Sequence, residues 1–156
     1  MNNILDEILA YSPKVEAKYK ESIIEKFSQK QVEKGGDSRK FFNMYWQPFA
    51  WAAMLGFKND RRTPLSGKTD PDIFKYSVIN NQAPDILRAL VVMAVGKLDD
   101  NENIEFQLKR LKKPDEIVNI INEYANGGFE IISRKLNEDP DYFYEHNKFI
   151  TDLFEN

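Results

Sequence analysis

The sequence predicts an all-α fold, a compact single-domain bundle of about six to eight helices. Three observations support this class. Apolar residues recur at helical spacing along most of the chain, four prolines are followed directly by aspartate, and no segment has the sustained alternation of a half-buried strand. A chain of 156 residues is long enough to bury one substantial core.

The chain is expected to form one helical domain, residues 1–156, that begins with an N-terminal helical pair, residues 1–33. Ser12 and Pro13 favour a helix start, with Ser12 as its N-cap. The stripe behind this start has helical spacing and consists of Val15, Tyr19, Ile23 and Phe27. The stretch "QVEKGGDSRK", residues 31–40, predicts a flexible loop that joins the pair to the main bundle.

The densest aromatic segment, "FFNMYWQPFAW", follows this loop. Most of its aromatic residues share one helical face, so we expect them to be buried. Pro48 predicts a break near Gln47 and a new helix from Pro48, ending near Gly56. Trp51 lies off the apolar stripe, which leaves two interpretations open: exposure beside the basic residues, or burial in the core together with Trp46.

The four Pro-Asp pairs, which begin at Pro71, Pro84, Pro114 and Pro140, predict helix starts. Proline suits the first helical position, and an acidic residue in the first turn complements the helix dipole. The helix after Pro84 is expected to be the buried centre, with a stripe of Leu87, Leu90, Val91, Ala94 and Leu98. The helix after Pro114 is expected to end at Gly127-Gly128, and two shorter helices then follow, marked by Phe129, Ile132 and Leu136 and by Phe143, Ile150 and Leu153.

The composition of the chain excludes several classes of function. The net charge of −3 predicts no global attraction to nucleic acid or membrane. The absence of cysteine excludes disulfides, thiolate catalysis and zinc fingers, and it favours a reducing cytoplasm. The first residues lack the pattern of a signal peptide, and the longest apolar run, residues 89–95, is far shorter than a membrane span. We therefore expect a soluble cytoplasmic protein.

The stretch "PLSGKTDP" contains Gly67-Lys68-Thr69, the last letters of a phosphate-binding loop. Such a loop needs an earlier glycine between a strand and a helix. Arg62 stands at that position, Pro64 has no N–H to donate, and the preceding segment has helical spacing. The match therefore predicts no nucleotide site.

Basic residues gather just after the aromatic segment. Residues 58–68 carry Lys58, Arg61, Arg62 and Lys68 against Asp60, whereas residues 137–156 are strongly acidic. This basic loop is the candidate binding surface for an anion or a partner, with Trp51 beside it. The alternative interpretation is a solvated loop that pairs with the acidic tail, within one molecule or between subunits.

No residue pattern indicates catalysis, a metal site or a cofactor. The only histidine, His146, shares the apolar face of the expected last helix, which favours a packing role. Asp70 and Asp72 lie near the aromatic residues, but their spacing alone cannot establish a carboxylate pair.

The sequence thus favours a small cytoplasmic interaction protein of bacterial or phage type, an accessory or subunit of a larger assembly. It would use an aromatic and basic surface around residues 46–68, most simply to bind a protein partner, and the sequence favours a non-enzymatic role over an enzymatic one. One alternative is a nucleic-acid-associated factor that binds phosphates through residues 58–68. A second is a small hydrolase that uses Asp70, Asp72 or His146. Homo-oligomerisation stays open, and no membrane partner is expected.

Overall fold

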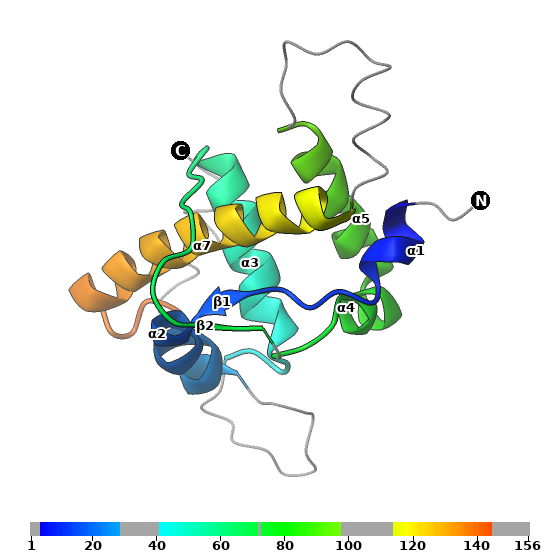
Figure 1. The fold of residues 1–156 in the computed structure, drawn as a ribbon. Helices are drawn as coiled ribbons and strands as arrows, with labels where there is room; N and C mark the ends of the chain where they lie inside the picture. The colour runs from blue at the N-terminus through cyan, green and yellow to red at the C-terminus, as the bar shows by residue number, and fades with distance from the viewer. Residues whose placement is uncertain (1–3, 29–40, 72, 98–113, 145–156) are drawn as a thin grey trace.

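The computed structural model describes residues 4–28, 41–71, 73–97 and 114–144. These residues are mostly helical, which confirms the predicted fold class (Figure 1). The elements in chain order are α1 Ile4–Ile8, β1 Val15–Glu16, α2 Ala17–Tyr19, the π-helix η1 Lys20–Glu25, α3 Trp46–Lys58, β2 Thr69–Asp70, α4 Tyr76–Gln82, α5 Pro84–Val95 and α7 Pro114–Glu138.

Helix α7 organises the fold. It runs across the molecule from yellow to orange in Figure 1, and its contacts with α3 are the most extensive between any two elements. Helices α1, α4 and α5 gather towards its N-terminal end, and α2 lies near its C-terminal half (Figure 1). There the Tyr19 ring stacks on Phe129 of α7, with 5.6 Å between ring centroids.

Two of the predicted helix starts are confirmed, because α5 begins at Pro84 and α7 at Pro114, each with acidic residues in its first turn. Two others are wrong: α4 begins only at Tyr76, well after Pro71, and the chain after Pro13 forms a strand before α2 begins. Pro140 lies in a turn, and the helix expected after it falls mainly outside the described residues.

The sequence analysis missed a short antiparallel pair. In β1 and β2, Val15 pairs with Asp70 and Glu16 with Thr69. The pairing continues into α2, because the Ala17 amide donates to the Lys68 carbonyl at 2.8 Å. Two residues per strand are too few to produce a visible alternation, and the pairing partners are far apart in the sequence. This tertiary pairing explains why Ser12-Pro13 and Pro71 do not start helices.

The predicted end of a helix at Gly127-Gly128 is also wrong, because α7 continues through both glycines. They allow the backbones of two segments to approach α7 closely. A Cβ atom on Gly128 would overlap the Ala52 carbonyl of α3, and one on Gly127 would overlap the Arg61 carbonyl. Gly56 meets α7 in the same way, against the Tyr124 carbonyl. These glycines therefore serve packing rather than helix termination.

The apolar stripes expected to be buried are largely found in the core. It includes Tyr19, Ile23, Phe27, Leu87 and Leu90. Leu98, Ile150 and Leu153 lie outside the described residues, as does the whole of the loop expected at 31–40. The arrangement of residues 1–156 as one domain with an N-terminal helical pair stays a prediction. Among the described residues, no helix combines the length and the apolar character needed to cross a bilayer.

Candidate functional site

The basic loop begins at a defined helix end. Helix α3 runs two residues past the expected end at Gly56, to Lys58. Asp60 then adopts a left-handed conformation with φ of 50°. The Asp60 amide donates to the Phe57 carbonyl at 3.2 Å and the Arg61 amide to the Gly56 carbonyl at 2.9 Å, which is a Schellman motif. Aspartate tolerates this conformation better than most residues, so the turn could be missed in a search for glycine.

This turn directs both arginines of the loop towards α7. The Arg61 guanidinium lies 2.6 Å from Glu130 Oε2, and the Arg62 guanidinium lies 2.7 Å from Glu123 Oε1. Asn126 adds a further attachment, since its side-chain amide donates to the carbonyls of Thr63 and Pro64. The loop is therefore fastened along α7. The arginines pair with α7 itself; residues 145–156 of the acidic tail lie outside the described residues.

The contacts of Glu130 and Asp60 explain the low pKa of each carboxylate. Burial disfavours its charged form, but hydrogen bonds from Arg61 and Thr63 outweigh burial and hold the pKa of Glu130 below its usual value. Asp60 behaves similarly: the hydrogen bond and charge of Lys97, at 3.0 Å, keep the pKa of Asp60 low. Both carboxylates therefore pair with basic side chains in their charged form.

The residues of the phosphate-loop match and of the hydrolase alternative have other surroundings. Lys68 is exposed next to β2, and Thr69 begins that strand, so the Gly-Lys-Thr letters precede a strand rather than a helix. Asp70 lies 2.7 Å from the Lys20 ammonium group. Asp72 and His146 lie outside the described residues.

Trp51 and Lys58 are brought onto one surface between α3 and α5. Two adjoining hollows of about 350 and 270 Å³ share Met54. The first is lined mainly by aromatic and apolar residues, including Trp51 and Ile86. The second is lined by Met54, Phe57, Lys58, Met93, Gly96 and Lys97. We call this surface the α3–α5 groove. It has an aromatic end and a basic end.

The aromatic end is held in place by polar contacts. The Gln47 side chain accepts hydrogen bonds from the amides of Asn43 and Met44, which fixes the chain before α3. Trp46 is buried, and its indole N–H donates to Gln82 of α4 at 3.1 Å. Pro48 lies in the first turn of α3, where its missing N–H is tolerated, and the helix starts two residues earlier than expected. Trp51 is half-buried rather than fully exposed.

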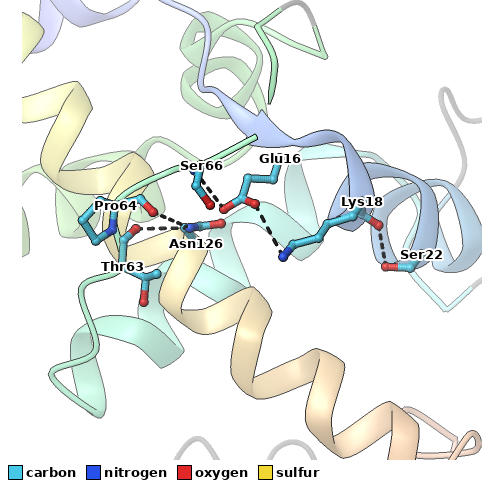
Figure 2. Close-up of polar contacts among 7 residues, drawn as sticks. All are labelled: Glu16, Lys18, Ser22, Thr63, Pro64, Ser66 and Asn126. Carbon is cyan, nitrogen blue, oxygen red and sulfur yellow. Dashed lines mark hydrogen bonds and ion pairs between the residues drawn. The ribbon is translucent and has the colours of Figure 1, made fainter. Parts of the chain in front are cut away.

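A separate, polar hollow was not anticipated. It measures about 300 Å³ and lies where β1, the basic loop and α7 meet. Its lining includes Glu16 from β1, Thr63 and Ser66 from the basic loop, and Glu130 from α7. Figure 2 shows Glu16 beside Ser66 and Lys18, and Asn126 of α7 next to Thr63 and Pro64. Glu16 is a charged residue in a strand that the sequence analysis did not predict. The sequence therefore held no signal for this hollow.

The described residues define a small, mostly helical protein with a loop fastened along α7, a groove between α3 and α5, and a polar hollow beside α7. Residues 15–152 match the family of DNA sulphur modification system-associated protein 4, and the chain belongs to this family. No curated protein and no solved structure matches the chain. The family description supports the expected accessory role in a larger system.

Proposed function

We propose that this protein binds a protein partner of the DNA sulphur modification system through the α3–α5 groove. The observation that carries the proposal is the convergence of Trp51, Met54 and Lys58 on one surface. Tryptophan is enriched among residues that dominate binding energy, and methionine adapts to irregular apolar partners. The family description, which names an associated protein of such a system, fits this role.

The groove favours an amphipathic helix as the partner segment. Its aromatic end would take large apolar side chains, in the way that helix-in-groove complexes bury one helical face. The other end is lined by Lys58 and by Lys97, which also pairs with Asp60, and this end would favour an acidic residue next to that face. The partner is therefore expected to present an apolar stripe followed by a carboxylate.

Direct binding of DNA by the basic loop is less favoured. Arg61 and Arg62 already contact carboxylates of α7, so phosphate binding would have to displace Glu130 and Glu123. The hydrolase alternative finds little support at Asp70, whose carboxylate is engaged by Lys20. A system that modifies DNA acts where DNA is, which agrees with the cytoplasmic location expected from the sequence.

The test is calorimetric titration with each of the other proteins of the same modification system. Trp51→Ala should weaken the productive interaction about thirtyfold or more, as truncation of a central tryptophan costs about 2 kcal/mol or more. Val92→Ala is the control, because Val92 is apolar and 69% exposed but lies outside the groove, in a separate apolar hollow of about 380 Å³ between α1 and α5. It should bind like the unchanged protein.

Other outcomes would contradict the proposal. If both variants bind as strongly as the unchanged protein, the partner binds a surface other than the groove. Binding only to duplex DNA, with a salt dependence that falls in an Arg61→Ala, Arg62→Ala double variant, would favour the nucleic-acid alternative. Self-association that Trp51→Ala abolishes, without binding to any other protein, would make the groove an interface between copies.

A further inference from the structure

The described chain stops beside the aromatic end of the α3–α5 groove. Its last described residue is Tyr144, whose ring centroid lies 5.9 Å from that of Phe41. The Phe41 ring also stacks on Phe143, with 5.5 Å between centroids, and Phe41 lines the aromatic end of the groove. Residues 145–156, which lie outside the described residues, are therefore joined to the chain at the entrance of this groove.

The length of this C-terminal segment matches the length of the groove. The groove follows α3 from Gln47 at its aromatic end to Lys58 at its basic end. An α-helix rises about 1.5 Å per residue, so this part of α3 and a helix of residues 145–156 would each span about 17 Å. A helix that begins beside Phe41 and runs parallel to α3 would thus reach the basic end.

The segment has the amphipathic pattern that the groove favours. Its sequence is EHNKFITDLFEN, and in a helix Ile150, Leu153 and Phe154 would share one face. Two carboxylates, Asp152 and Glu155, lie within its last five residues. The segment therefore combines an apolar stripe with acidic residues near its end, which is the pattern expected of a groove partner.

Charge complementarity selects the direction in which the segment would lie. Residues 145–156 carry three carboxylates against one lysine, whereas the basic end of the groove is lined by Lys58 and Lys97. Complementary charges across an interface fix its register and disfavour other arrangements. An orientation parallel to α3 places the apolar stripe over the aromatic end and the last carboxylates at the basic end.

We propose that residues 145–156 occupy the α3–α5 groove of the free protein as a helix parallel to α3, and that the protein partner displaces them. The displacement rests on the function proposed above, whereas the docking of the segment does not. A site that its own chain fills for about nine-tenths of the time binds a partner about tenfold more weakly. The segment therefore excludes helices that match the groove poorly.

Zero-length cross-linking tests the docking in the unchanged chain. A carbodiimide joins a lysine to a carboxylate only where the two groups touch, and mass spectrometry of the digest identifies the pair. We expect a link from Lys58 or Lys97 to Asp152 or Glu155 within one molecule. Lys68, which is exposed next to β2, is the control and should link to neither carboxylate.

Loss of the apolar stripe should uncover the groove. In a Trp46→Phe background, Trp51 is the only indole. An Ile150→Ala, Leu153→Ala double variant should then show stronger acrylamide quenching of Trp51 and emission at longer wavelength, without any partner present. Thr151→Ala, which lies off the stripe, is the matched control and should change neither quantity.

The two parts of the proposal fail separately. Once a partner is known, the double variant should bind it about tenfold more tightly than the unchanged protein does. Unchanged partner affinity, together with the expected cross-link and quenching, would keep the docking and contradict the displacement. If no partner binds the groove, the proposed function fails, while the cross-links and the quenching still decide the docking.

A link from Asp152 or Glu155 to Lys68 instead would place the segment on the basic loop and overturn the docking. So would a link found only in a species of twice the mass, which would make the groove an interface between two copies. Equal quenching in the double variant, the control and their common background would also overturn it. If circular dichroism shows that the double variant does not fold, the cross-links of the unchanged chain decide the question.

Discussion

Replacement of Gly128 by alanine tests how closely α3 and α7 approach. A Cβ atom at this position would overlap the backbone carbonyl of Ala52, and a backbone atom cannot rotate away as a side chain can. The two helices must therefore separate. Overpacking costs about 1–3 kcal/mol, and we expect the upper end here because backbone must move. Alanine recovers about 1 kcal/mol of helix propensity, so the net loss should be about 2 kcal/mol.

Urea unfolding and thermal melting measure this loss. A net loss of about 2 kcal/mol should lower Tm by about 4–8 °C in a chain of this size. Gly96→Ala is the matched control: Gly96 has right-handed helical angles, and its nearest atoms would lie 3.5 and 3.6 Å from a new Cβ, an ordinary contact. That variant should be neutral or gain about 0.4–1 kcal/mol. Equal or greater stability of Gly128→Ala, relative to the unchanged protein, would refute the close approach.

Three further predictions concern the basic loop. The folded-state pKa of Glu130 lies below its ordinary value, so its contribution to stability is present above about pH 4.5 and disappears as the pH falls through the folded pKa. The Glu130→Gln variant should therefore lose less stability between pH 7 and pH 3 than the unchanged protein. An identical loss in both proteins would contradict this. The Arg61→Ala, Arg62→Ala double variant should lose about 1 kcal/mol in urea unfolding, since partly exposed ion pairs each contribute about 0.2–1 kcal/mol; a loss above about 4 kcal/mol would mean that the arginines hold the core together. Lys68→Ala should fold normally and neither it nor the unchanged protein should bind ATP in a calorimetric titration; micromolar binding that the variant loses would restore the phosphate-loop interpretation.

Local signals in the sequence located the long helices well. Pro84 and Pro114, each followed by aspartate, combine helix-start geometry with favourable charge, and both begin helices. The same pair at Pro71 does not, because Thr69 and Asp70 form a strand with residues more than fifty positions away. Glycine pairs were misleading for a related reason. Gly127 and Gly128 are needed because the backbone of another segment leaves no room for a Cβ atom, and no local sequence pattern indicates such a contact.

The site residues stay a prediction, and only part of their surroundings could be foreseen from the sequence. The aromatic segment and the basic loop were recognised as chemically distinctive, and the structure aligns Trp51 with Lys58 along the α3–α5 groove. The partners of Arg61 and Arg62 could not be foreseen, because Glu130 and Glu123 are about sixty or more residues away and reach the loop only through the packing of α7. The polar hollow beside Glu16 was missed because it exists only after β1, the loop and α7 come together.

The fluorescence of Trp51 tests the proposed groove most directly. The chain has two tryptophans, and Trp46→Phe leaves Trp51 as the only indole reporter. In this variant, acrylamide quenching is measured as the partner protein of the modification system is added to saturation. The account predicts that quenching of Trp51 falls and that its emission shifts to shorter wavelength. Unchanged quenching at a saturation confirmed by calorimetry would show that the partner binds elsewhere.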